Sequence, residues 1–85
     1  LTATELPLVK KTIFSHLEAG RPVICVMGPG DFTASGHFIV MTGLKDGLIC
    51  VNDPNSRANS QKLWDFDQIS DQIRNLWMLE KAPVG

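Results

Sequence analysis

The chain has 85 residues, of which 44% are hydrophobic and 20% are charged, and its formal net charge is −1. This length and balance predict one small globular domain and exclude a disordered segment. A near-neutral chain offers no basic patch for a phosphate backbone, and no apolar run reaches the roughly 20 residues that span a bilayer, so we expect neither a nucleic acid partner nor a membrane span.

The first predicted element is a helix over Thr4–Ala19, because apolar side chains recur there at helical spacing. The run from Thr2 to Glu5 fits a capping box at its start. Gly20 supplies a left-handed stop at its end. His16 falls on the polar side, so we expect it at the surface. The predicted core positions of this helix are Leu6, Val9, Ile13, Phe14 and Leu17.

Three strands are predicted next, because short runs rich in branched apolar residues alternate with turn-forming residues. The first covers Pro22–Met27. A loop over Gly28–Gly36 follows, and it lacks both the lysine and the glycine spacing of a phosphate-binding loop. The second and third strands cover Phe38–Leu44 and Leu48–Asn52. The Lys45-Asp46-Gly47 segment between them predicts a hairpin.

The last third of the chain predicts a polar loop over Asp53–Gln61, a short strand at Leu63-Trp64 and a short helix that Asp65 caps. Phe66, Ile69 and Ile73 share one side of that helix. A final strand over Leu76–Leu79 and a loose tail over Ala82–Gly85 complete the chain. The order of elements predicts the α+β class, a small antiparallel sheet with helices segregated from it.

The two cysteines, Cys25 and Cys50, both lie inside strand-like apolar runs. Cysteine commonly packs as a small hydrophobic residue, so we expect both to be inert core thiols. No CxxC pair and no companion histidine spacing accompany them, which argues against a zinc site. We expect no metal and no cofactor.

His37 opens one predicted strand, and Asp53 closes the next. The register of their hairpin decides whether they meet, because a slip of one residue moves a side chain to the other face. A two-residue loop would pair Lys45 with Leu48 and turn Asp53 away from His37. A three-residue loop, which Gly47 favours, would place Asp53 opposite Ile39 and on the same side as His37. On spacing alone, the structural interpretation is favoured, namely a satisfied strand-end histidine and a simple Asp-Pro turn.

Several motifs in order resemble the C39-like peptidases, members of the papain-like cysteine peptidase superfamily that occur in bacteria. These motifs are a helix end with Gly20-Arg21-Pro22-Val23, then Gly36-His37-Phe38, then Asn52-Asp53-Pro54. Each is short, but their order and spacing extend over nearly the whole chain. The resemblance implies that residues 1–85 are the C-terminal lobe, or half-domain, of a papain-like peptidase domain.

The resemblance implies that His37 is the general base of a thiol acyl transfer and that Asp53 orients it. It also implies a nucleophilic cysteine, preceded by an oxyanion-hole glutamine, on a helix N-terminal to this chain. Neither Cys25 nor Cys50 matches that nucleophile. We therefore expect no peptidase activity from the 85-residue chain alone. The alternative is a non-catalytic peptidase-like module that binds a peptide or a protein.

The expected partners follow from the same resemblance. The substrate would be a peptide or protein, and the chain would associate with a Cys-bearing N-terminal half or form a homo-oligomer. Because the sequence begins with Leu1, we expect it to be a processed or excised part of a longer protein. Such a part would leave its His37 face uncovered and would expose there the apolar surface that its other half covers.

Overall fold

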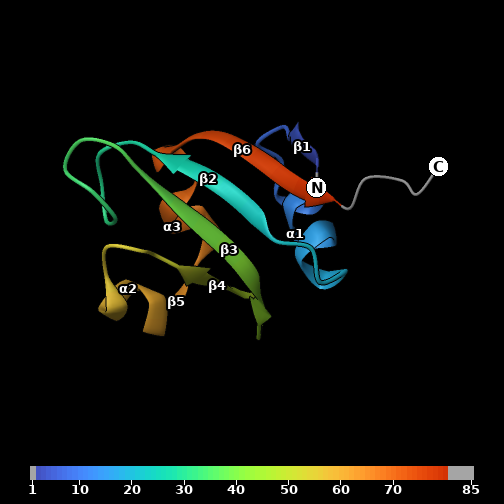
Figure 1. The fold of residues 1–85 in the computed structure, drawn as a ribbon. Helices are drawn as coiled ribbons and strands as arrows, with labels where there is room; N and C mark the ends of the chain where they lie inside the picture. Colours follow the sequence, from blue (N-terminus) through green and yellow to red (C-terminus); the bar gives the residue numbers. More distant parts are fainter. Residues whose placement is uncertain (1, 81–85) are drawn as a thin grey trace.

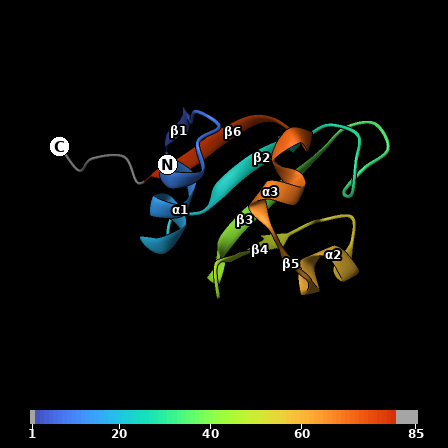
Figure 2. The same ribbon diagram turned by 180° about the vertical axis from the view of Figure 1, so that it is seen from behind.

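The fold is a six-stranded antiparallel sheet with strand order β1-β6-β2-β3-β4-β5, seen in a computed structural model that describes residues 2–80 (Figure 1). Helices α1 and α3 cover one face of this sheet, as the reverse view shows (Figure 2). The predicted class, a small antiparallel sheet with segregated helices, is confirmed. In chain order the elements are β1 (Thr2–Glu5), α1 (Lys10–Glu18), β2 (Val23–Met27), β3 (His37–Lys45), β4 (Leu48–Asn52), α2 (Arg57–Gln61), β5 (Leu63–Trp64), α3 (Phe66–Ile69), a 3₁₀ helix (Ser70–Gln72) and β6 (Ile73–Glu80).

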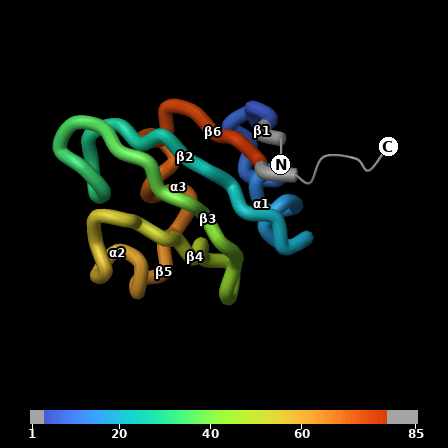
Figure 3. Tube along the Cα trace, viewed as in Figure 1, coloured from blue at the N-terminus to red at the C-terminus, as the bar shows by residue number. Residues whose placement is uncertain are grey.

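The predicted helix over Thr4–Ala19 starts too early, because its first residues form strand β1 instead. β1 pairs with β6, at the other end of the chain, so two segments distant in sequence lie side by side (Figure 3). The Leu6 N–H extends this pairing to the Leu76 carbonyl at 2.9 Å. Pro7 favours an extended conformation at Leu6 and disfavours a helix across this point. The predicted capping box does not form, and helix α1 begins after Val9 with no side-chain cap.

Helix α1 ends as predicted, at a glycine in the left-handed region. Gly20 has φ of 76°, and its N–H donates to the Leu17 carbonyl at 3.0 Å. The helix packs Ile13 and Leu17 against the sheet. His16, predicted at the surface, is half-buried instead, and its Nδ1 is buried with no hydrogen-bond partner among the described residues.

The hydrophobic core lies between the sheet and helices α1 and α3. Alternate residues of β2 and β3 face it, because successive side chains of a strand point to opposite faces. The buried apolar residues are Ile13, Leu17, Val23, Cys25, Met27, Phe32, Ile39, Met41, Ile49, Val51, Trp64, Phe66, Ile69, Ile73 and Leu76.

The β3–β4 hairpin has a two-residue loop, so the predicted three-residue loop is wrong. Lys45 pairs directly with Leu48. Asp46 and Gly47 both adopt positive φ, at 52° and 78°, which is the conformation that a tight hairpin between twisted strands requires. Aspartate tolerates this region better than most residues do, and glycine adopts it without strain.

A β-bulge at Thr42 restores the register that the loop alone would lose. Met41 pairs with Val51 and Gly43 with Cys50, so Thr42 is an extra residue in β3. Its hydroxyl donates to the Cys50 carbonyl at 3.3 Å. Beyond the bulge Val40 pairs with Asn52, and the next step places Asp53 beside Ile39. Asp53 therefore lies on the same side as His37, as expected, but the bulge rather than the loop length is the cause.

Smaller differences concern the last third of the chain. The predicted polar loop Asp53–Gln61 contains helix α2, whose five residues carry no apolar periodicity. The strand at Leu63–Trp64 and the short helix behind Asp65 are present, and β6 begins earlier than predicted, at Ile73. The predicted tail over Ala82–Gly85 lies outside the described residues.

The sheet face opposite α1 and α3, the outer face, carries apolar side chains. Phe38 is 59% exposed there, and half-buried apolar residues of β2, β3 and β6 lie on the same face, namely Ile24, Val26, Val40 and Trp77. Cys50, predicted as a core thiol, also faces this side because its neighbours Ile49 and Val51 face the core. Within residues 2–80 the structure shows no helix with the length and hydropathy that a membrane crossing requires.

Candidate active site

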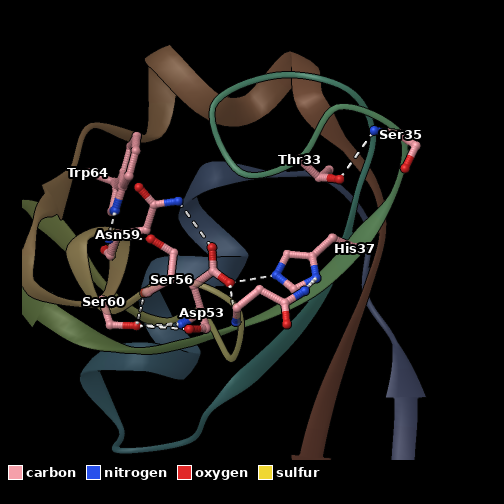
Figure 4. Close-up of polar contacts among 9 residues, drawn as sticks. Thr33, Ser35, His37, Asp53, Ser56, Asn59, Ser60 and Trp64 are labelled. Carbon is pink, nitrogen blue, oxygen red and sulfur yellow. Dashed lines mark hydrogen bonds and ion pairs between the residues drawn. The ribbon is translucent and has the colours of Figure 1, made fainter.

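The predicted pair of His37 and Asp53 forms a direct contact at one end of the sheet (Figure 4). His37 is the first residue of β3 and shares the core face with Ile39 and Met41. Its Nε2 lies 2.5 Å from Asp53 Oδ1. Only 9% of the His37 side chain is exposed. The two residues that the sequence singled out are therefore neighbours in a largely desolvated position.

Asp53 is a buried carboxylate with three hydrogen-bond donors, and the residue is only 3% exposed. Oδ1 accepts from His37 and from the Asn55 N–H at 2.9 Å, while Oδ2 accepts from Asn59 Nδ2 at 3.1 Å. A buried charge is tolerated only when such partners replace its water. Both carboxylate oxygens are thus fixed, and the plane of the group is fixed with them.

Helix α2 supplies the groups that hold Asp53 in place. Ser56 caps the helix by accepting the Asn59 N–H at 3.1 Å. Ser60, one turn later, accepts the Asp53 N–H at 2.8 Å. Its hydroxyl also lies within hydrogen-bond distance of the Asp53 carbonyl, at 3.2 Å. This short polar helix therefore holds the Asp53 backbone through Ser60, and its side chain through Asn59.

The surroundings of Asp53 favour its ionised form. Burial alone would raise the pKa of this carboxyl, since it penalises the charge. The hydrogen bonds from His37, Asn59 and the Asn55 backbone act in the opposite direction and outweigh it, so the pKa lies below its usual value. Asp53 is therefore an acceptor without a proton near neutral pH.

The charge state of Asp53 determines which ring nitrogen of His37 carries the proton. A carboxylate cannot donate, so Nε2 must be the N–H that donates to Oδ1. In the neutral ring Nδ1 then holds a free electron pair. Asn55 Nδ2 lies 3.1 Å from this Nδ1 and is its donor. The geometry thus leaves Nδ1 without a proton, and the bond from Nε2 to Asp53 holds the ring in place.

The loop that leads into His37, Gly28–Gly36, packs against the same assembly. Phe32 is buried, and its ring lies 4.5 Å from the ring of Trp64, centroid to centroid. The Trp64 indole N–H donates in turn to the Asn59 carbonyl at 3.0 Å. A continuous chain of contacts therefore joins this loop to Asn59, the residue that holds Asp53.

Gln72 forms hydrogen bonds to the loop Gly28–Gly36. Its Oε1 accepts the Asp31 N–H at 2.8 Å, and its Nε2 donates to Asp31 Oδ2 at 2.8 Å. The Gln72 carbonyl also accepts the Gly28 N–H at 2.7 Å. A Cβ at Gly30 would collide with the Gln72 side chain, so this close approach requires glycine there.

Both cysteines of the chain are free thiols, and among the described residues no hydrogen bond joins either of them to His37 or Asp53. Cys25 is fully buried in β2, where burial raises its pKa to about 12, so its thiol stays protonated near neutral pH. Cys50 lies on the outer face, opposite to the face of His37. Among residues 2–80 no cluster of His, Cys, Asp and Glu side chains is placed to hold a metal ion.

Sequence reasoning did not identify three residues of this site, namely Asn55, Asn59 and Ser60. The signal was present in the run that follows Asp53. An aspartate two residues before Asn55 is typical of a turn in which the side chain accepts a backbone N–H, and Ser56 three residues before Asn59 is a helix-cap spacing. Both patterns indicate local structure, and neither by itself points toward His37.

Comparison with known proteins places this chain in a family. The chain matches the Peptidase_C39 like family over residues 3–81. No curated protein matches significantly. A crystal structure of a candidate C39-like peptidase from Bacillus anthracis has the same fold, with a TM-score of 0.56 and 16% sequence identity; the match covers 95% of this chain and 52% of that one. The chain thus spans about half the length of this relative. Because the family match extends over nearly all of its length, the chain belongs to the Peptidase_C39 like family.

Proposed function

We propose that this chain is the part of a cysteine peptidase that carries the general base, with His37 as base and Asp53 as orienting acid. The contact between His37 Nε2 and the buried, ionised Asp53 is the observation that carries the proposal. It leaves Nδ1 of His37 as a proton acceptor, and it fixes the orientation of the imidazole ring. Family membership supports peptide bond hydrolysis as the reaction.

The proposed reaction is thiol acyl transfer. His37 Nδ1 accepts the proton of a cysteine thiol, and the thiolate sulfur attacks the carbonyl carbon of the peptide bond. When the tetrahedral intermediate collapses, the C–N bond breaks and Nδ1–H gives its proton to the leaving amine. Water, losing a proton to Nδ1, then hydrolyses the thioester to a carboxylic acid and regenerates the thiol. Asp53 stabilises the imidazolium that forms in both steps.

We propose that the nucleophile comes from a segment outside this chain. Cys25 is buried and protonated, and Cys50 faces away from His37, so both cysteines are unsuitable. The related structure is about twice as long as this chain, which leaves room for a Cys-bearing half. A thiol from that half would need to approach the Nδ1 side of His37.

The outer face supports association with a second copy or another covering segment, although the sequence predicts exposed apolar surface on the His37 face instead. Phe38 is 59% exposed among half-buried apolar neighbours, and clusters of this kind mark unfinished interfaces. The apolar cluster lies on the face opposite to His37. A covering segment there would stabilise the sheet without occupying the site itself.

Hydrolysis assays on two proteins test the proposal. The 85-residue chain alone should cleave no peptide, whereas the full-length gene product should cleave peptides and lose activity in His37→Ala. Asp71→Asn, at an exposed residue, is the matched control and should retain activity. Cleavage by the 85-residue chain that Cys25→Ser or Cys50→Ser abolishes would contradict the external nucleophile. Full-length protein that binds peptides but never cleaves them would favour the non-catalytic module.

A further inference from the structure

Asn55 contacts both members of the His37–Asp53 pair, although neither the sequence motifs nor the proposed mechanism uses it. Its backbone N–H donates to Asp53 Oδ1 at 2.9 Å, and its side-chain Nδ2 lies 3.1 Å from His37 Nδ1. These bonds close a ring that runs from the carboxylate through the imidazole and the asparagine back to the carboxylate. Asn55 therefore occupies the nitrogen that the orienting acid leaves free.

The proton positions in this ring leave one arrangement for the neutral pair. Asp53 is ionised, so Nε2 carries the ring proton and Nδ1 presents an electron pair. An electron pair needs a donor, and the Asn55 amide supplies one. Once Nδ1 gains a proton it becomes a donor itself, and the same amide N–H₂ group would then face it donor to donor. The Asn55 contact with Nδ2 toward the ring is compatible with the resting base, whereas a protonated Nδ1 requires this N–H₂ group to turn away from it.

We propose that Asn55 is a gate on His37, a side chain that occupies Nδ1 in the resting site and must turn away before Nδ1 accepts a proton. This inference rests on the proposed function, in which Nδ1 takes the proton of a thiol. A thiol that donates to Nδ1 needs the position that Asn55 Nδ2 now holds. The nucleophile and the Asn55 amide therefore compete for one electron pair.

The local structure allows this side chain to move without disturbing the pair. Asn55 is exposed, whereas Asp53 is buried. Its backbone N–H, not its side chain, closes the turn on Asp53. Rotation about the Asn55 side-chain bonds would release Nδ1 and leave the carboxylate with all three of its donors. Only 9% of the His37 side chain is exposed, so Nδ1 is otherwise shielded from solvent. Rotation of Asn55 would therefore open the route by which another group reaches Nδ1.

Two measurements on the 85-residue chain test the gate. In ¹⁵N-labelled protein, the hydrogen bond should give a scalar coupling between Asn55 Nδ2 and His37 Nδ1. The second measurement is the rate at which diethyl pyrocarbonate acylates His37, with mass spectrometry to assign the residue and NMR to assign the nitrogen. We expect Asn55→Ala to accelerate acylation at Nδ1 about threefold to tenfold, the factor that one neutral hydrogen bond corresponds to.

The control is Asn75→Ala, which removes an exposed asparagine whose amide donates to Glu5 instead. Its acylation rate should stay within about twofold of the unmodified chain. A second variant, Asn55→Asp, cannot donate from its carboxylate, so the coupling should vanish and Nδ1 should gain a proton while Nε2 keeps the proton that it donates to Asp53. An unchanged acylation rate in Asn55→Ala, or a coupling that is absent in the unmodified chain, would overturn the gate. These readouts need no peptidase activity, so they fail or succeed independently of the proposed function.

Discussion

Removal of the Asp53 carboxylate should cost this small domain about 2–6 kcal/mol of unfolding free energy. Asp53→Ala deprives three donors of their acceptor. The Asn55 N–H belongs to an exposed residue and can bind water instead, whereas the His37 ring is 9% exposed and Asn59 is half-buried. A buried donor without a partner costs about 1–3 kcal/mol, and hydrogen bonds to charged groups lie toward the upper end. Two such donors give the stated range.

This loss is large against the roughly 4–13 kcal/mol expected of a domain of this length. Urea unfolding at pH 7 measures it, with Asp71→Ala as the exposed control, which should change stability by less than about 0.5 kcal/mol. Double substitution of His37 and Asp53 should cost less than the sum of the single changes, because the two share one bond. A loss below about 1 kcal/mol in Asp53→Ala would refute the buried, ionised carboxylate.

Three further predictions follow from the bulge, the thiols and the carboxylate. Deletion of Thr42 should remove the bulge but keep the pairs Met41–Val51 and Gly43–Cys50, so Asp53 should stay beside Ile39 and NMR should still show the His37–Asp53 hydrogen bond; loss of that bond would mean that Thr42 is not the extra residue. In the folded chain Cys50 should react with iodoacetamide near pH 8 well before Cys25, whose pKa is about 12; equal rates would contradict its burial. Folding lowers the pKa of Asp53, so the carboxylate should contribute its full stabilisation above the pKa of the unfolded state, about 3.9. That stabilisation should be lost as the pH falls through the lower pKa of the folded state. Urea unfolding at several pH values tests this, and the same acid dependence in Asp53→Ala would contradict it.

The sequence predicts the central hairpin well because its signals are local. Asp46-Gly47 between two apolar runs indicates a tight turn, and alternating burial in β2 and β3 follows from their apolar residues. The error over the loop length arose because a β-bulge has no strong residue signature. Thr42 is an ordinary strand residue, and only pairing with both neighbours shows that it is extra.

The N-terminal segment could not be predicted from local pattern alone. Residues Thr2–Glu5 form a strand because β6 lies beside them, at the other end of the chain. Helical spacing of apolar residues continued across Pro7, and pairing with β6 overrides that local preference.

The candidate site was predictable in its two principal residues and not in its supports. His37 and Asp53 follow from strand ends, whose relative position depends on sheet geometry. Asn55 and Asn59 depend on how the turn and helix α2 fold back on the pair, and their short polar run carries no periodicity that indicates this. Hydrogen-bonded supports of a site are therefore identified from the structure rather than from the pattern.

The rate at which the nucleophilic thiol reacts tests most directly whether His37 activates a cysteine from outside this chain. In the full-length gene product, alkylation of that thiol by iodoacetamide would be measured at pH 6, with the site mapped by mass spectrometry. A free thiol with a pKa near 8.5 is less than about 1% ionised at this pH, whereas a thiolate paired with an imidazolium is largely ionised. We predict that His37→Ala slows alkylation at least tenfold and that Asp71→Asn does not. An equal rate in the His37→Ala protein would contradict the proposed role of His37.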